Sequence, residues 1–230
     1  MFEKLGTTYD TAKMAIYRLQ SAYLPQGWAR DVHVTVSAQG IITALDTRLP
    51  AAPEQMALAA MEQVEGNVIP GMPNAHSHAF QRAMAGNAEY RLSARDSFWT
   101  WRQAMYALAN RITPEELQIV ATELFVEMLK SGYTSVAEFH YLHRPSGVQQ
   151  YLGANLFWEA VGNAARDAGI GLTLLPTLYQ SSDFGGAPLK PEQARFALET
   201  EGFLRAIEER IGADRRAGLR TVRTGAAFHS

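Results

Sequence analysis

The feature that most constrains this fold is the alternation of helical and β-type segments that begins at about Val68. From there onward, four apolar β-type segments are separated by segments with helical periodicity. Strands that alternate with helices in this way are typical of βα units whose strands lie parallel in one sheet. The pattern therefore predicts an α/β fold for residues 68–230.

The clearest helix is predicted over residues 114–130, where both ends carry the expected signals. Thr113 is a candidate N-cap, Pro114 occupies the first helical position, and Glu116 completes a capping box. Gly132 follows the last turn, in the position of a C′ glycine. The other predicted elements are helices over 155–167 and 191–210 and strands over 134–140, 172–179 and 221–228.

Residues 17–67 show a different pattern, with short segments in which apolar and polar residues alternate. Val32, Val34 and Val36 form the clearest example, and glycine-containing turn signals lie between the segments. We expect these residues to form a small antiparallel β portion. Residues 1–16 show no clear pattern and are expected to be a poorly ordered leader.

Composition excludes several classes of function. The 230-residue chain has a net charge of −2 and a pI of about 6.3, and no basic cluster indicates nucleic acid. No apolar run is long enough for a membrane span, and the N-terminus lacks the apolar stretch of a signal peptide. The absence of cysteine excludes disulfides, thiolate zinc sites and cysteine nucleophiles. We therefore expect a cytoplasmic enzyme with a small-molecule substrate, in which histidine and carboxylate groups hold any metal.

His76 and His78 are the strongest candidates for chemistry. They lie one residue apart on a segment predicted to be extended, so their side chains point to the same face. Two imidazoles at the end of a strand are half of a catalytic metal site. A surface turn that contains two histidines is the alternative, but the apolar strand, the Pro-Gly turn and Asn74 before the pair favour metal binding.

Polar residues follow two later strands, where a (β/α) barrel would place its active site. For His140 we favour a packed histidine bonded to backbone, and for His143 a solvated loop residue, whereas Tyr141 fits either packing or the site. His229 is either a site residue or a frayed terminal residue. Glu138 is either a general base or the partner of a neighbouring cation.

The segment 98–102 combines aromatic side chains with one cation. It is either a helix that packs its tryptophans or one wall of a substrate pocket. In the second case Arg102 would pair with a carboxylate through its planar, two-pronged guanidinium. The glycine-containing loop at 183–186 lacks the spacing of a phosphate loop, so no nucleotide is predicted.

Residues 70–82, which contain His76 and His78, resemble the signature of the amidohydrolase superfamily in the form used by formimidoylglutamate deiminases. The Glu-Phe-His-Tyr-Leu-His stretch at 138–143 is what selects the deiminase. The resemblance extends from about Leu19 to Ser230. It also includes residues 132–143, 175–179, 184–186 and 226–230.

The resemblance implies a TIM-like (β/α)8 barrel with a small β-sandwich built partly from the N-terminal strands. It implies one divalent metal, usually zinc, and hydrolysis of N-formimino-L-glutamate to N-formyl-L-glutamate and ammonia, a step of histidine degradation. It is also compatible with a homodimer of the full-length protein.

Position by position, the resemblance implies that His76 and His78 are metal ligands. It also implies that Gln81, Arg102, Tyr141 and His229 contact the substrate. Arg102 and Tyr141 suit the carboxylates of the substrate, which need fixed cationic and hydroxyl partners.

Family members carry a third metal histidine, a catalytic histidine and an aspartate ligand at later positions. We therefore expect residues 68–230 to be a truncated barrel of about four βα units with no catalytic residue of its own, inactive when isolated. One alternative is another amidohydrolase that deaminates a purine, pterin or triazine ring. The other is a non-catalytic half-barrel that pairs with a partner or a second copy.

Overall fold

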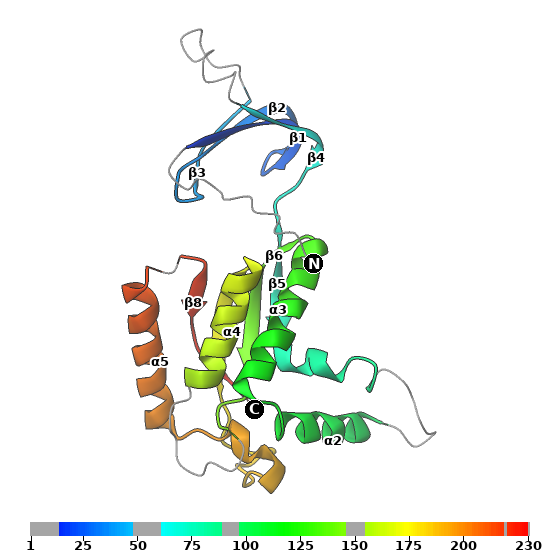
Figure 1. Ribbon diagram of the computed structural model, residues 1–230, viewed down its shortest axis with the longest axis vertical. Helices are drawn as coiled ribbons and strands as arrows, with labels where there is room; N and C mark the ends of the chain where they lie inside the picture. The colour runs from blue at the N-terminus through cyan, green and yellow to red at the C-terminus, as the bar shows by residue number, and fades with distance from the viewer. Residues whose placement is uncertain (1–13, 48–60, 89–96, 146–154, 219, 230) are drawn as a thin grey trace, which may run out of the picture. The chain divides into compact units, whose positions relative to one another are not determined.

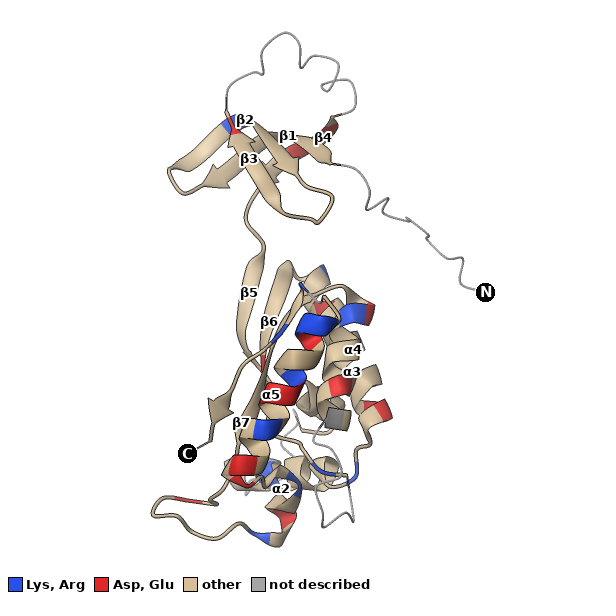
Figure 2. Cartoon of the chain, turned by 90° about the vertical axis from the view of Figure 1, so that its left-hand side faces the viewer, with Lys and Arg blue, Asp and Glu red and all other residues tan. Residues whose placement is uncertain are grey.

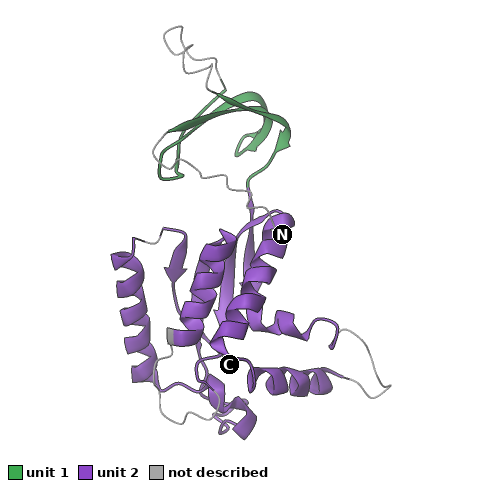
Figure 3. Cartoon of the chain, viewed as in Figure 1, with its two compact units in different colours: residues 1–70 green, residues 71–230 purple. Residues whose placement is uncertain are grey.

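The computed structural model describes residues 14–47, 61–88, 97–145, 155–218 and 220–229. The chain divides into two compact units, Met1–Pro70 and Gly71–Ser230 (Figure 3). Most of the predicted leader lies outside the described residues. Its last two residues, Ala15 and Ile16, belong to the first strand, which therefore begins two residues earlier than the predicted β portion.

Unit 1 contains a four-stranded sheet in the order β3-β2-β1-β4 (Figure 1). The three pairs differ in direction: β1 with β2 and β2 with β3 are antiparallel, whereas β1 with β4 is parallel. The prediction of an antiparallel sheet is therefore right for three strands and wrong for the fourth. Strand β4 runs in the same direction as β1, and parallel neighbours cannot be joined by a tight turn. The strands are β1 Ala15–Leu24, β2 Gly27–Val36, β3 Ile42–Asp46 and β4 Glu62–Val68.

The interior of unit 1 is small. Ala22, Val32 and Val34 are its buried apolar residues, packed by partly buried neighbours from the same strands. Val32 and Val34, two residues apart on β2, both lie on its buried face, as the period of two along a strand predicts. The residues that the structure describes form one sheet in this unit, and a sandwich partner for it stays a prediction.

Unit 2 is an α/β structure with a parallel sheet, as predicted. The strand order is β5-β6-β7-β8, and every neighbouring pair is parallel. The short strand β9, which follows β8 in the sequence, also pairs with β7 in parallel. Helices α3, α4 and α5 connect successive strands (Figure 1). The strands are β5 Met72–Ser77, β6 Tyr133–His140, β7 Gly171–Leu178, β8 Val222–Thr224 and β9 Ala227–Phe228, and the helices are η2 Ala79–Met84, α2 Phe98–Ala109, α3 Pro114–Lys130, α4 Asn155–Ala168, η3 Pro191–Phe196 and α5 Thr200–Arg216.

Local signals place α3 as predicted. Thr113 Oγ1 accepts a hydrogen bond from the Glu116 backbone N–H at 3.1 Å, and Glu116 Oε2 accepts one from the Thr113 N–H at 2.9 Å. Gly132 has a φ of 89°, the left-handed conformation that a C′ glycine tolerates. The capping box and the C′ glycine therefore set the two ends of the helix.

The helix predicted over 191–210 is wrong. The structure has a short 3₁₀ helix, η3, followed by a break and then α5. At Ala197 the backbone turns extended, with φ −68° and ψ 129°, and forms a bridge with Tyr179. This break lets both Phe196 and Phe203 reach the interior from separate elements.

The strand predicted over 221–228 is also divided, into β8 and β9. Gly225 lies between them, where its N–H donates to the Leu174 carbonyl at 2.8 Å. A Cβ atom at this position would lie 2.9 Å from Leu175 Cδ2, so a larger residue would need the Leu175 side chain to shift.

One apolar core lies between the sheet and helices of unit 2, centred on fully buried side chains such as Phe125, Trp158 and Leu174. Strands β5 and β7 carry no Asp, Glu, Lys or Arg, whereas the helices carry many of them (Figure 2). In the described parts of the chain, no helix combines the length and apolar character needed to cross a membrane.

Candidate active site

The two histidines of the H-x-H motif converge at the end of β5. His76 Nε2 and His78 Nε2 lie 3.0 Å apart, and the ring centroids are 4.6 Å apart. Asn74 Oδ1 accepts a hydrogen bond from the His76 backbone N–H at 3.2 Å, which supports the bend of the segment. The structure thus brings together the pair that the sequence predicts.

The proton of His78 is placed by its neighbour on β6. Nδ1 lies 2.7 Å from the carbonyl oxygen of Phe139, and a carbonyl only accepts, so Nδ1 carries the proton. Burial lowers the pKa of His78, and the nearby His76 and His229 lower it further. The ring is therefore neutral, and its Nε2 lone pair is available on the side that faces His76.

These features fit a divalent metal. A neutral imidazole whose other nitrogen is held by a carbonyl is the usual form of a histidine ligand. Within the described ranges, no group of three or more His, Asp or Glu side chains is placed to hold a metal. A catalytic zinc usually has three protein ligands, so a zinc held by this pair would need at least one further protein donor.

A pocket of about 340 Å³ opens beside the pair. Its lining includes His78 and all four residues predicted to bind substrate, Gln81, Arg102, Tyr141 and His229. Gln81 lies on η2, Arg102 on α2, Tyr141 directly after β6 and His229 directly after β9. The topology therefore gathers at one place four side chains that are far apart in the sequence.

Gln81 and Tyr141 form one side of the pocket. Gln81 Nε2 donates to the Tyr141 hydroxyl at 2.8 Å, and the Tyr141 ring lies 5.1 Å from the His78 ring. Burial raises the pKa of Tyr141, so its hydroxyl stays protonated at neutral pH. Tyr141 thus packs in the interior and lines the pocket at the same time.

His229 is held in place rather than frayed. Its backbone N–H donates to the Leu178 carbonyl at 3.0 Å, and its ring lies 4.1 Å from the Tyr179 ring with 30° between the planes. This contact fixes the imidazole at the edge of the pocket.

Arg102 supplies a positive charge to the lining of the pocket. Its Nε donates to the Tyr106 hydroxyl at 2.6 Å, and its guanidinium lies 5.3 Å from the Tyr106 ring and 5.7 Å from the Trp99 ring. Burial alone would lower the pKa of Arg102, but the hydrogen bond with Tyr106 and the contact with Tyr179 raise it overall. A permanently charged guanidinium therefore faces the pocket.

With this geometry established, comparison with known proteins identifies the family. The model of the Amidohydrolase family matches residues 67–224, which is more than half of the chain. This chain belongs to the amidohydrolase family.

Individual relatives agree with this assignment. The chain is 44% identical over 211 residues to a formimidoylglutamate deiminase from Pseudomonas aeruginosa, covering 92% of this chain and 44% of that protein. The structure of an amidohydrolase from Brucella melitensis matches with a TM-score of 0.83 and 40% identity, over 94% of this chain and 46% of that one. The chain thus spans about half the length of these relatives.

A more distant structure supports the fold alone. It is atrazine chlorohydrolase from Arthrobacter aurescens TC1 complexed with zinc, matched with a TM-score of 0.68 and 18% identity. The match covers 93% of this chain and 46% of that one.

Glu138 of this amidohydrolase lies outside the pocket lining. It is fully buried, its Oε1 accepts from the Ala79 backbone N–H at 2.5 Å, and the neighbouring Ser77 side chain also favours its charged form. No cation contacts it among the residues of known position, so the predicted ion pair is wrong. Burial raises the pKa of Glu138 to about 7, because hydrogen bonds to neutral groups compensate its charge only in part.

The two histidines after β6 have structural roles. His140 is buried and donates from Nε2 to the Leu142 carbonyl at 2.7 Å, which confirms the prediction of a packed histidine. His143 is not a solvated loop residue, so that prediction is wrong. It is 1% exposed, donates from Nε2 to the Thr177 carbonyl and accepts from Trp158 Nε1. Its partners come from β7 and α4, which no local signal reveals.

Three residues of the pocket region were missed by the sequence reasoning. They are Tyr106, Tyr179 and the fully buried Gln193, whose Nε2 lies 3.0 Å and 2.9 Å from the two tyrosine hydroxyls. Tyr106 follows Arg102 by four residues, so helical spacing could have indicated it. Gln193 lies 87 positions after Tyr106 and had no such signal.

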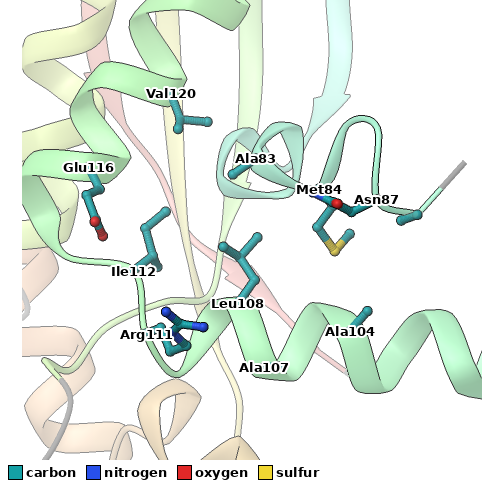
Figure 4. Close-up of a pocket in the computed structure, with 11 residues that line it drawn as sticks. Ala83, Met84, Asn87, Ala104, Ala107, Leu108, Arg111, Ile112, Glu116 and Val120 are labelled. Carbon is teal, nitrogen blue, oxygen red and sulfur yellow. The ribbon is translucent and has the colours of Figure 1, made fainter.

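A second hollow of about 500 Å³ lies between η2, α2 and α3 (Figure 4). Its described lining is mostly alanine and larger aliphatic side chains, together with the charged residues Arg111 and Glu116. It contains none of the predicted site residues and no histidine. Convergent polar groups mark the pocket beside His78 as the candidate site instead.

Proposed function

We propose that this chain is part of a formimidoylglutamate deiminase, which hydrolyses N-formimino-L-glutamate to N-formyl-L-glutamate and ammonia. The observation that carries the proposal is one pocket in which His78 of the converging pair meets Arg102 and Tyr141. Hydrolysis of an amidine carbon needs an activated water, and binding of a dicarboxylate needs a fixed cation. The pocket places the groups suited to these two tasks side by side. The 44% identity to a formimidoylglutamate deiminase supports the same substrate.

In this proposal His76 and His78 hold one divalent metal, zinc, together with donors from outside the described residues. The metal would supply a Lewis acid that lowers the pKa of a water molecule and polarises the formimino carbon. The hydrogen bond from His78 Nδ1 to the Phe139 carbonyl keeps the imidazole neutral and fixes its plane.

The substrate side of the pocket is assigned to Gln81, Arg102, Tyr141 and His229. Arg102 binds a carboxylate, because its terminal N–H groups match two carboxylate oxygens. Tyr141 donates its hydroxyl proton to the substrate, since its oxygen already accepts from Gln81. His229, fixed against Tyr179, contributes its imidazole to the contacts with the substrate.

The proposal extends to the fold and the setting. Unit 2 forms about four βα units of a TIM-like barrel, because its parallel strands end beside the same pocket, and unit 1 contributes to a β-sandwich. A cytoplasmic location, a role in histidine degradation and a homodimeric full-length protein complete the proposal. We expect the 230-residue chain to lack activity by itself, since the described metal site has two histidines.

A chimera tests this function. The chain replaces the corresponding part of the Pseudomonas aeruginosa deiminase, and ammonia release from N-formimino-L-glutamate is measured with zinc present. We expect turnover that Arg102→Ala lowers by about a hundredfold in kcat/KM, the effect of losing a charged hydrogen-bonded partner. Tyr133→Phe, outside the pocket, is the matched control. Nearly unchanged turnover in the Arg102→Ala chimera would contradict the carboxylate argument.

A ring deaminase acting on a purine, pterin or triazine is the second candidate. The pocket lining includes Trp101, Phe139 and Tyr141, whose flat faces suit an aromatic ring. Such a substrate has little use for Arg102. Turnover of a ring substrate by the same chimera, insensitive to Arg102→Ala, would favour this candidate over the first.

A further inference from the structure

Two tyrosines and a glutamine form a hydrogen-bonded group around Arg102. Tyr106 and Tyr179 line the same pocket as Arg102. Gln193 is fully buried next to them, and its side-chain nitrogen Nε2 lies within hydrogen-bond distance of both phenol oxygens, at 3.0 Å and 2.9 Å. One amide nitrogen therefore serves both phenols.

The orientation of this amide is fixed by the backbone. Gln193 Oε1 accepts a hydrogen bond from the Lys190 N–H at 2.8 Å, so the oxygen faces Lys190 and the NH₂ group faces the tyrosines. An NH₂ group has two protons and no acceptor. Both phenol oxygens must therefore act as acceptors toward Gln193.

Arg102 also makes a phenol oxygen act as an acceptor. Its Nε donates to the Tyr106 oxygen at 2.6 Å, and its positive charge also interacts with Tyr179. A guanidinium has only donors, so the Tyr106 oxygen accepts from both Arg102 and Gln193, while the Tyr179 oxygen accepts from Gln193. The phenol protons themselves then have no acceptor within the described residues.

The pocket offers these protons a particular kind of ligand. Among the described residues of its lining, Arg102 is the only permanently charged side chain, and none is Asp, Glu or Lys. A guanidinium and two phenol protons at one wall form a set of donors without a built-in acceptor. Such a wall selects an anion whose oxygens can accept several hydrogen bonds.

We propose that Tyr106 and Tyr179, oriented by Gln193, donate hydrogen bonds to the substrate carboxylate that Arg102 binds. The inference rests on the proposed function and adds two binding residues and one positioning residue to it. Gln193 does not touch the ligand. It acts by making both phenol oxygens acceptors, which leaves the phenol protons for the carboxylate.

Glutarate, a dicarboxylate without the formimino group, is the probe. Its Kd for the 230-residue chain is measured by titration calorimetry for the unaltered chain and for Tyr106→Phe and Tyr179→Phe. Each variant keeps the ring and loses one donor, so we expect about a tenfold higher Kd, typical for a hydrogen bond to a charged group. Tyr133→Phe, at the start of β6 and outside the pocket lining, should leave Kd unchanged.

Gln193→Glu tests the positioning role with almost no change of shape. A carboxylate at this place accepts hydrogen bonds, so both phenol protons turn toward it and away from the pocket. We expect the Kd for glutarate to rise at least as far as in either tyrosine variant, while the circular dichroism spectrum stays native. A merely structural role of Gln193 would change the melting temperature and leave the Kd of the folded protein unchanged.

The outcomes separate this inference from the proposed function. If Arg102→Ala weakens glutarate binding but both tyrosine variants bind normally, the inference is overturned and the carboxylate role of Arg102 stands. Normal binding by the Gln193→Glu chain overturns the positioning role of Gln193. If glutarate fails to bind the unaltered chain at millimolar concentration, the carboxylate pocket and the inference are both overturned.

Discussion

His78 Nδ1 and the carbonyl oxygen of Phe139 lie 2.7 Å apart, across the β5–β6 pair. This hydrogen bond joins the H-x-H motif to the next strand of the parallel sheet. It determines which nitrogen of His78 is protonated and turns the other nitrogen toward His76, 3.0 Å away. The proposed metal binding by the motif therefore depends on β6 as well as on β5.

Zinc binding should depend on both histidines of the pair. We expect His76→Asn and His78→Asn each to weaken zinc binding by the 230-residue chain by at least about tenfold, since each removes one of two ligands. Competition with a chromophoric chelator measures the affinity. His33→Asn, in unit 1, is the control that retains zinc binding. Zinc held equally well by the His78→Asn chain would contradict the proposed ligands.

The sequence predicts local features of this fold better than it predicts the contacts between distant segments. Thr113, Glu116 and Gly132 act within one or two turns of chain, so their pattern determines both ends of α3. His76 and His78 are also a local pattern, because two alternate positions on a strand share a face. Local periodicity is sufficient for such features.

The predictions that were wrong, for His143 and for the helix around Ala197, share a different cause. The interior position of His143 depends on Trp158 and on the Thr177 carbonyl, and both partners lie on other elements. The break at Ala197 is stabilised by a bridge to Tyr179, although the apolar spacing around it favours a continuous helix. Contacts between distant segments override local preference in both cases, so no single-segment pattern could have shown them.

Acid should destabilise the fold through His140 and His143. Burial lowers their pKa values to about 4 and about 3, so the unfolded chain binds protons first as the pH falls below 6.5. Unfolding is thus favoured between pH 6.5 and 4, by up to about 1.4 kcal/mol per pH unit for each histidine. His143→Asn should reduce this slope in urea unfolding measured at pH 7, 6 and 5. An unchanged slope would show that folding does not lower the pKa of His143.

Glu138 should have the opposite pH dependence. Its pKa is raised to about 7 by burial, so the folded protein holds a proton that the unfolded chain releases near pH 4.5. The stabilisation is complete below pH 4.5 and is lost as the pH rises through 7. Glu138→Gln removes this titration with little change of shape. We expect the variant to gain stability relative to the unaltered chain as the pH rises from 4.5 to 7, and the difference to level off above pH 7, measured by urea unfolding. A constant difference between pH 4.5 and 7 would contradict the buried, protonated carboxyl.

The buried cation Arg195 should be a major source of stability in unit 2. Its guanidinium donates to the carbonyls of Arg144, Ala109 and Ile112, which belong to the β6–α4 connection and the end of α2. Burial lowers its pKa to about 10, so it is still charged at neutral pH. In Arg195→Met these buried carbonyls lose their donor.

Because an unpaired buried carbonyl costs about 1–3 kcal/mol, we expect Arg195→Met to lower the free energy of unfolding by at least about 3 kcal/mol. Arg205→Met is the matched control, since Arg205 is exposed on α5 and its replacement should change stability by about 0.5 kcal/mol or less. Urea unfolding followed by tryptophan fluorescence measures both, because Trp158 is buried in the same core. Equal stability of the two variants would show that Arg195 contributes no more than an exposed arginine, and that the three carbonyls find other donors.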